Sequence, residues 1–262
     1  MATLDIDSCA SKNFRVMKIF MINLARRPER LEYMKHQMIS AGIAYERINA
    51  VDGMVLTSDE RRNAIRAFRW WCVNGYAARP GEIGCALSHQ MVYRKMIDEN
   101  LSTACILEDD VRLDTRFCEV TKAAEDFLCS NGIARVLIMT PYKGRKGCDA
   151  TKPMLTRVDW AASTGGYILN VEAAKRLLEV NTPLVGPADN WGRWARKGHI
   201  ELYTIDPIAC WQDAYASVPD NPAFASDTID AETVFVKDMP LVRRVLHKMG
   251  RVVGIAIDKV LP

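Results

Sequence analysis

Short apolar runs alternate with stretches of helical periodicity along most of this chain, and this alternation limits the folds open to it. Residues 16–24 are mostly apolar and are followed by Pro28, which suits the first turn of a helix. The same order recurs where a compact apolar run at 103–107 precedes a predicted helix at 114–129. Strands that alternate with helices are typical of an α/β fold with a mainly parallel, covered sheet.

The remaining predicted elements continue this alternation. Thr57, with Glu60 three residues later, forms a capping-box pattern before a helix that is expected to run to about Phe68. Asn170 is expected to end a strand and to cap the helix after it. The other predicted elements are a helix from Pro28, strands at 45–51, 134–139, 165–170 and 201–205, and helices at 85–97 and 171–180.

Composition narrows the class of protein. The chain has 262 residues, of which 49% are hydrophobic and 26% charged, which allows one large domain with a packed core. The net charge of +3 is too small to predict a nucleic-acid-binding protein. The eight cysteines form no C-x-x-C pair, which argues against a zinc site and favours a cytosolic compartment. We expect neither a signal peptide nor a membrane-spanning segment.

The C-terminal part has a different pattern. Residues 218–239 have little periodicity and are predicted to be a linker or mobile loop, which leaves 16–217 as the main domain. Residues 240–262 place apolar and basic side chains on opposite faces of a helix, and six basic against two acidic residues from position 237 onward leave a charge of +4. Such a helix is expected either to lie peripherally on the inner face of the cytoplasmic membrane or to pack on the domain or a second copy.

Three adjacent carboxylates, Glu108, Asp109 and Asp110, end the apolar run at 103–107. They repel one another unless a cation lies among them, and ligands of open α/β sheets bind at the carboxyl ends of strands. Mn²⁺ and Mg²⁺ prefer such oxygen ligands and can bridge to phosphates. On an extended backbone Glu108 and Asp110 would point the same way, with Asp109 turned aside. The alternative interpretation is a solvated acidic turn.

Two further stretches carry reactive or charged side chains. Arg27 and Arg30 lie at a predicted helix start and could contact phosphate or uracil, or could form salt bridges on a surface helix. His89 could be a general acid or base, a metal ligand or a buried structural histidine. Glu82 lies between two glycines, and this pattern predicts a tight, specially shaped turn at a helix start.

The order and spacing of these motifs resemble glycosyltransferase family 25 over about residues 16–217. The bacterial members of that family build lipopolysaccharide and capsule oligosaccharides. The matching motifs are Asn23-Leu24 with Arg27 and Arg30, Ala50-Val51-Asp52-Gly53, the Gly-Glu-x-Gly-Cys-x-Leu-Ser-His run from Gly81 to His89, Glu108-Asp109-Asp110-Val111, Thr164-Gly165-Gly166-Tyr167, Pro187-Ala188-Asp189 and, more loosely, Pro207, Gln212 and Ser217.

This resemblance implies a Rossmann-like, nucleotide-sugar-binding domain of the GT-A type. It implies transfer of a hexose with inversion onto lipopolysaccharide, capsule or another cell-surface glycan. Galactose from UDP-galactose is the expected donor, because many bacterial relatives use it, and glucose or an N-acetylated sugar is the alternative. Asp110 would hold Mn²⁺ or Mg²⁺, and Glu108 would contact the donor ribose or the metal. The nucleotide is expected near Asn23, Leu24, Arg27, Arg30, Asp52, Asp109 and Gln212.

Inversion in one step requires a general base that deprotonates the acceptor hydroxyl. Asp189 is the predicted base, in a loop beside Trp191, an aromatic residue able to stack on a sugar. The alternative is that Asp189 is an ordinary N-cap of the helix that follows it. Glu82 and His89 compete with Asp189 for the role of base, or would shape the acceptor pocket.

Two other function classes fit parts of the pattern. A nucleotidyltransferase also places carboxylates at a strand end and binds a nucleotide with Mg²⁺, but it would usually have a glycine-rich basic loop early in the chain. Here the first strand runs into Asn23-Leu24-Ala25 without a glycine. A non-catalytic nucleotide- or glycan-binding module would keep the fold without the chemistry, and the intact acidic triplet argues against it.

Overall fold

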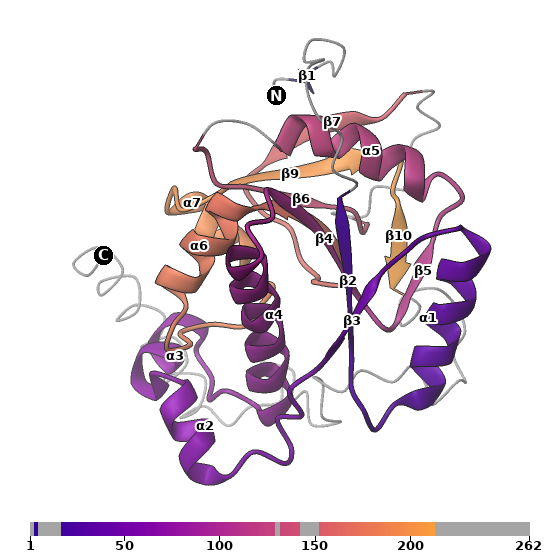
Figure 1. Cartoon of the computed structure of the whole chain (residues 1–262). Coiled ribbons are helices and arrows are strands. Elements are labelled where there is room, and N and C mark those ends of the chain that lie inside the picture. Colours follow the sequence, from indigo (N-terminus) through magenta and orange to yellow (C-terminus); the bar gives the residue numbers. More distant parts are fainter. Residues whose placement is uncertain (1–2, 5–16, 129–131, 142–151, 213–262) are drawn as a thin grey trace, which may run out of the picture. The chain divides into compact units, whose positions relative to one another are not determined.

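The structure is a computed structural model, which describes residues 3–4, 17–128, 132–141 and 152–212. Among these residues no helix is both long and apolar enough to cross a bilayer. The predicted linker at 218–239 and basic helix at 240–262 lie outside the described residues and stay predictions. The elements, labelled in Figure 1, are β1 (Thr3–Leu4), β2 (Lys18–Asn23), α1 (Pro28–Ser40), β3 (Glu46–Asn49), α2 (Ser58–Ala64), α3 (Ala67–Asn74), α4 (Pro80–Asp98), β4 (Thr103–Glu108), β5 (Val111–Leu113), α5 (Phe117–Leu128), β6 (Arg135–Ile138), β7 (Met154–Val158), β8 (Gly166–Asn170), α6 (Val171–Val180), α7 (Trp191–Arg196), β9 (Glu201–Asp206) and β10 (Cys210–Gln212).

The described residues fall into two compact units. The first unit contains the large sheet and is formed by described residues up to 50, from 88 to 180 and from 189 to 212. The second unit is formed by 51–87 and 181–188 and contains α2, α3 and the first part of α4.

The first unit is built on an eight-stranded sheet with the order β1-β7-β9-β6-β8-β4-β2-β3 (Figure 1). Strand β2 is parallel to both β3 and β4, and β6 is parallel to β9. Strand β8 is antiparallel to both β4 and β6, and β7 is antiparallel to β1 and β9. Among these eight described strands, six therefore point one way and two the other. The α/β prediction is confirmed, and the sheet is mixed rather than purely parallel.

The reversed strand β8 decides what lies at the edge where β4 ends. Because β8 is antiparallel to β4, its first residue, Gly166, pairs with Leu107 near the carboxyl end of β4. The backbone just before β8 therefore runs beside Glu108, whose N–H donates to the carbonyl of Gly165 at 2.9 Å. A separate two-stranded ribbon of β5 and β10 places Gln212 opposite Val111, close to the same edge.

Helices cover both faces of this sheet. On one face, Met34 and Met38 of α1 and Phe117 of α5 are buried in a cluster that includes Met21 of β2. The methionines lie four residues apart, as the helical spacing predicted. On the other face, the ring of Tyr167 packs against α7, and its hydroxyl hydrogen-bonds to α4. The site described below is built on this second face and at the carboxyl end of β4.

In the second unit, helix α2 begins with the predicted capping box but ends earlier than predicted. The capping box is present, because Thr57 and Glu60 accept hydrogen bonds from each other's backbone N–H groups. The helix stops at Ala64, four residues earlier than predicted. Ile65 is extended, with φ −123° and ψ 151°, and pairs with Leu184. Pairing with a residue so distant in the sequence overrides the local helical pattern.

Glu82 lies at a helix start, as predicted, but in the first turn of the helix rather than in a separate tight turn before it. Helix α4 already begins at Pro80, so Gly84 lies within it. A Cβ on Gly84 would come within 2.5 Å of the carbonyl oxygen of Val51, and a Cβ on Gly53 would overlap the carbonyl of Pro80. Glycine is needed at both positions because two backbone segments approach closely there.

Candidate functional site

The three carboxylates at the end of β4 face two directions. Glu108 and Asp110 both face the amide of Gln212, whose Nε2 lies 3.3 Å from Glu108 Oε2 and 3.4 Å from Asp110 Oδ1. Asp109 is turned toward Asn23 and Arg30. The first and third carboxylates thus converge on one polar group, as the sequence predicts. Asp109 and Asp110 form a turn between β4 and β5, so the extended backbone expected for the triplet is not the reason.

Asp109 belongs to a buried structural network. Arg30 Nη1 donates to its Oδ1 at 3.0 Å, and Asn23 Nδ2 donates to its Oδ2 at 2.6 Å. Arg47 donates to Asn23 Oδ1 at 2.8 Å. Burial raises the pKa of Asp109, and the positive charge of Arg30 opposes that shift. These side chains bind one another and tie β2, β3 and α1 to the end of β4.

Replacing Arg30 with glutamine is expected to lower the free energy of unfolding by about 3–5 kcal/mol, because it leaves the buried Asp109 carboxylate without its cation. The side chains of Arg30 and Asp109 are only 5% and 8% exposed. Urea denaturation checks this, with Arg26→Gln on the exposed side of the same turn as the control. Adding Asp109→Asn to Arg30→Gln should restore part of the loss, and full stability of Arg30→Gln alone would contradict the assignment.

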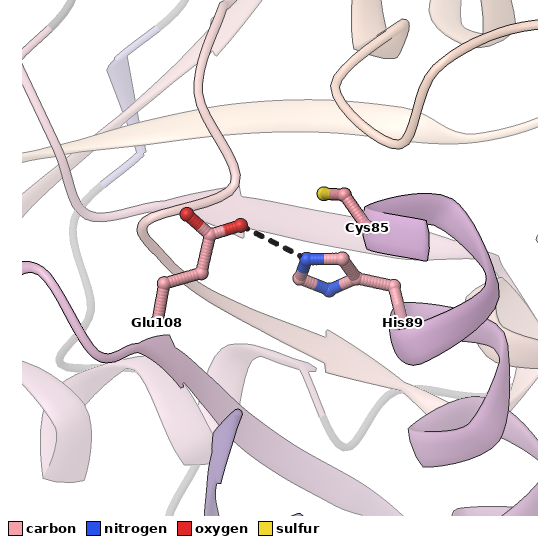
Figure 2. Close-up of side chains that lie close together, drawn as sticks. All are labelled: Cys85, His89 and Glu108. Atoms are coloured by element: carbon pink, nitrogen blue, oxygen red, sulfur yellow. Dashed lines mark hydrogen bonds and ion pairs between the residues drawn. The ribbon is translucent and has the colours of Figure 1, made fainter. Parts of the chain in front are cut away.

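His89 is buried beside Glu108, and the two side chains point toward each other (Figure 2). Its Nε2 is 3.1 Å from Glu108 Oε1, and its Nδ1 is 2.7 Å from the hydroxyl of Tyr167, which lies 2.9 Å from the hydroxyl of Tyr93. Cys85 lies four residues earlier on the same helix, one turn away (Figure 2). Because both ring nitrogens are hydrogen-bonded inside the protein, His89 contacts Glu108 rather than solvent.

The two converging carboxylates are affected differently by their surroundings. Burial raises the pKa of Glu108, but hydrogen bonds from His89 and from Thr164, the latter at 2.6 Å, bring it below its ordinary value. Burial and the negative charge of Glu108 raise the pKa of Asp110 to about 7. A buried pair of carboxylates in which the second resists ionisation is typical of a functional site that receives a positive charge.

Asp189 lies in the first unit, in the loop before α7. The backbone N–H of Ser163 donates to its carboxylate. Burial, and then the negative charge of Glu108, raise the pKa of Asp189. The N-cap residue of α7 is Asn190, and it makes no side-chain capping hydrogen bond. Asp189 is therefore not the N-cap of this helix.

Trp191 does not have the exposed ring that the sequence interpretation gave it. It is fully buried, its Nε1 donates to the carbonyl of Ser163 at 2.9 Å, and its ring lies 5.0 Å from that of Tyr167. Trp160 is 38% exposed and lies against α7, since a Cβ on Gly192 would come within 2.6 Å of its ring. The aromatic surface beside α7 thus comes from Trp160.

The other predicted residues are held by local contacts. Glu82, in the second unit, accepts a tyrosine hydroxyl at 2.6 Å and the backbone N–H of Arg79 at 2.9 Å, so it caps the start of α4. Asp52, also in the second unit, accepts the backbone N–H two residues later at 3.0 Å. In the first unit, the carbonyl of Leu24 accepts the N–H of Arg27 at 2.9 Å in the turn after β2.

Three residues at the site had no predicted role: Tyr93, Ser163 and Thr164. Thr164 donates to Glu108, and Ser163 bonds to the side chains of Gln212, Asp189 and Trp191. Ser163 and Thr164 reach the site because β8 is inserted antiparallel next to β4, whereas Tyr93 reaches Tyr167 from α4. A strand direction is set by distant pairing, so the sequence offered no local signal beyond the neighbouring glycines.

Comparison with known proteins identifies the family of this chain. The sequence profile of glycosyltransferase family 25 (LPS biosynthesis protein) matches residues 16–191. Procollagen galactosyltransferase 2 of Homo sapiens is 27% identical over 240 residues, which cover 80% of this chain and 37% of the human protein. A glycosyltransferase 25 family member of Aedes aegypti is 28% identical over 244 residues, 84% of this chain and 39% of that protein. Procollagen galactosyltransferase 2 of Mus musculus is 30% identical over 230 residues, which cover 81% of this chain and 34% of the mouse protein.

These matches span less than two fifths of the relatives' own lengths. The family profile, by contrast, covers more than half of this chain, and it includes both the carboxylates at the end of β4 and the loop with Asp189. On the extent of that match, the chain belongs to glycosyltransferase family 25.

Proposed function

We propose that this chain is a metal-dependent glycosyltransferase that moves galactose from UDP-galactose, with inversion, onto a lipopolysaccharide, capsule or other cell-surface glycan. The observation that carries the proposal is the convergence of Glu108 and Asp110 at the carboxyl end of β4, with Asp189 close enough to be influenced by the charge of Glu108. The names of the curated relatives support galactose, and the family description supports a lipopolysaccharide acceptor. A GT-A type fold is part of this proposal.

The converging side chains suit a hard divalent cation. Glu108 Oε2 and Asp110 Oδ1 are carboxylate oxygens that lie 3.3 Å and 3.4 Å from the same N–H donor, the Nε2 of Gln212. Carboxylate oxygens are the ligands that Mn²⁺ and Mg²⁺ prefer, so Glu108 and Asp110 would hold the ion. Bound there, a divalent ion would offset the negative charge that builds on the leaving diphosphate.

The protein's own residues divide the remaining work. Asp189 would accept the proton of the acceptor hydroxyl as the acceptor oxygen forms its bond to the anomeric carbon and UDP leaves. Burial raises the pKa of Asp189 toward neutral pH, and a general base is most effective when its pKa lies near the pH of the reaction. His89 is buried and bonded to Glu108, so we assign it to holding that carboxylate rather than to taking a proton from the acceptor.

The residues first expected near the nucleotide receive different roles. Arg30, Asn23 and Asp109 bind one another, so we assign them to shaping the end of β4. Arg27 is half-buried in the turn after β2, with its guanidinium 3.6 Å from Glu29. It is the arginine of this turn that we propose for a diphosphate contact.

The direct test is to incubate the purified protein with a panel of UDP-sugars, with Mn²⁺ or with chelator, and to measure released UDP. Release from UDP-galactose that depends on Mn²⁺ and is lost in Asp110→Ala would support the proposal. An enzyme that requires its acceptor would release no UDP in this assay, so calorimetric titration with UDP and Mn²⁺ measures binding directly. Absence of both UDP release and UDP binding would contradict the proposal. Metal-dependent binding without turnover on any glycan acceptor would favour a non-catalytic module, and release of pyrophosphate from a nucleoside triphosphate would favour a nucleotidyltransferase.

We expect Trp160 to contribute to acceptor binding by stacking on a sugar ring, because its partly exposed ring lies against the helix that follows Asp189. Trp160→Ala should raise the acceptor KM about three- to tenfold and leave the donor KM unchanged. Gly192→Ala, whose new Cβ would displace the ring, should act in the same direction. Steady-state kinetics measures both, with Met154→Ala, another exposed apolar residue, as the control. An unchanged acceptor KM in Trp160→Ala would contradict this expectation.

A further inference from the structure

The segment just before β8, residues 163–165, bonds both to Gln212, which contacts the carboxylates, and to Asp189, the proposed base. Its first residue, Ser163, has a φ of 74°, in the left-handed region that non-glycine residues rarely adopt. In this conformation its hydroxyl bonds to Gln212, its backbone N–H bonds to Asp189 and its carbonyl accepts from Trp191. Strained residues of this kind persist where the surrounding contacts hold them, and they cluster at functional sites.

We propose that Ser163 is a positioning residue, which fixes the side-chain amide of Gln212 so that its N–H donors face Glu108 and Asp110. Only the expected effect of Ser163 on metal and donor binding rests on the proposed function. The orientation itself is a property of the protein without ligands.

The donors and acceptors around Ser163 determine which way the amide points. The backbone N–H of Gly165 donates to Ser163 Oγ at 3.0 Å, and Ser163 Oγ lies 2.8 Å from Gln212 Oε1. With Oγ already accepting from Gly165, its own proton is directed to Gln212 Oε1. The Nε2 group of Gln212 must then point to the opposite side, where the two carboxylates require donors.

The backbone of the same segment holds the rest of the Gln212 side chain. A Cβ on Gly165 would come within 2.6 Å of Gln212 Cγ and 2.8 Å of Gln212 Cδ, so the side chain lies flat on the glycine backbone. A Cβ on Gly166 would likewise overlap the sulfur of Cys210 in β10. These contacts give the Thr-Gly-Gly-Tyr run its physical reason, since the glycines leave room for β10 and its glutamine.

The consequence concerns the carboxylates that would hold the cation. Without the Ser163 hydroxyl, the Gln212 amide could turn, and Glu108 and Asp110 would lose the donor that holds them in their present orientation. Residues that orient the ligands of a metal site typically change metal affinity or activity by about 10–100-fold when they are replaced. Asp189 and Trp191 bond to the backbone of Ser163, so replacing its side chain leaves those contacts in place.

The test compares Ser163→Ala with Ser163→Gly, because both remove the hydroxyl and glycine also accepts the positive φ. We expect both variants to weaken Mn²⁺ binding and to lower kcat/KM for the donor by about 10–100-fold, with the acceptor KM unchanged. The matched double variant is Ser163→Gly with Gln212→Ala, which should lose no more than Gln212→Ala alone. Independent, multiplicative losses in the double variant would overturn the proposal.

A readout without metal or substrate separates this proposal from the proposed function. In the ¹⁵N spectrum of the ligand-free protein, the side-chain amide of Gln212 is identified by the signals that disappear in Gln212→Ala. Those signals should be protected from exchange with water in the natural protein and lose that protection in Ser163→Gly. Unchanged protection in Ser163→Gly would overturn the role of Ser163. Absence of Mn²⁺ and UDP binding in the natural protein would overturn the proposed function, and the spectrum would still decide the role of Ser163.

Discussion

Replacing Asp110 with asparagine is expected to reduce sugar transfer about a thousandfold and, at the same time, to make the metal-free protein more stable. Loss of one carboxylate ligand removes several kcal/mol of stabilisation from the transition state, and about 4 kcal/mol corresponds to a factor of about 10³ in rate. The gain in stability comes from the same carboxylate, whose ionised form is disfavoured by burial and by the neighbouring charge of Glu108.

The pH dependence of this gain follows from the pKa of Asp110, which is raised from an ordinary value of 3.8 to about 7 in the folded state. Between these two pH values the folded protein holds a proton that the unfolded chain has lost, so the contribution of Asp110 to stability falls as pH rises. Above about pH 7 the penalty is complete and is on the order of 2–4 kcal/mol. The advantage of Asp110→Asn should therefore grow up to about pH 7 and then stay constant.

Thermal unfolding at several pH values, in chelator and in Mn²⁺, measures this prediction. In chelator at pH 8 the variant should unfold at a temperature about 3–8 °C higher than the natural protein. Added Mn²⁺ should raise the unfolding temperature of the natural protein and leave that of the variant unchanged. Asp98→Asn, at an exposed position on α4, is the control for loss of a negative charge. Full transfer activity in Asp110→Asn would contradict the assignment of Asp110 to the cation.

Replacing Asp189 with asparagine is expected to lower kcat by about 10²–10⁴-fold, the usual contribution of a general base. UDP binding should remain unchanged, because the proposed donor contacts lie at the ends of β2 and β4. The transfer rate of the natural protein should fall as pH is lowered through the pKa of Asp189, because only the ionised carboxylate accepts a proton. Since burial and Glu108 raise that pKa, the fall should begin at a higher pH than for an ordinary aspartate.

Single-turnover transfer and calorimetric titration with UDP separate these two effects. Asp189→Glu, which keeps the carboxylate on a longer side chain, should recover part of the rate. Asp159→Asn is the control, because Asp159 is exposed and lies on the segment that packs against the same helix. Near-normal kcat in Asp189→Asn would remove this residue from the role of base.

The sequence alone determined the features that depend on neighbours within a few residues. The spacing of Met34 and Met38 predicted the buried face of α1, and Asn170 caps α6 by accepting the N–H of Ala173 at 3.0 Å. The apolar run followed by Glu108, Asp109 and Asp110 placed carboxylates at the carboxyl end of a strand. Local backbone geometry sets each of these arrangements, so a short window of sequence contains the information.

Only the tertiary structure decided which distant residues meet these local features. The extended Ile65 ends α2 because it pairs with Leu184, and Trp191 is buried because Tyr167 of β8 packs against it. The antiparallel direction of β8 brings Ser163 and its neighbours to the end of β4. Strand pairing and burial depend on contacts between residues far apart in the chain, and the free energy of those contacts overrides local propensity. The carboxylates could therefore be predicted from the sequence, but the residues that orient them could not.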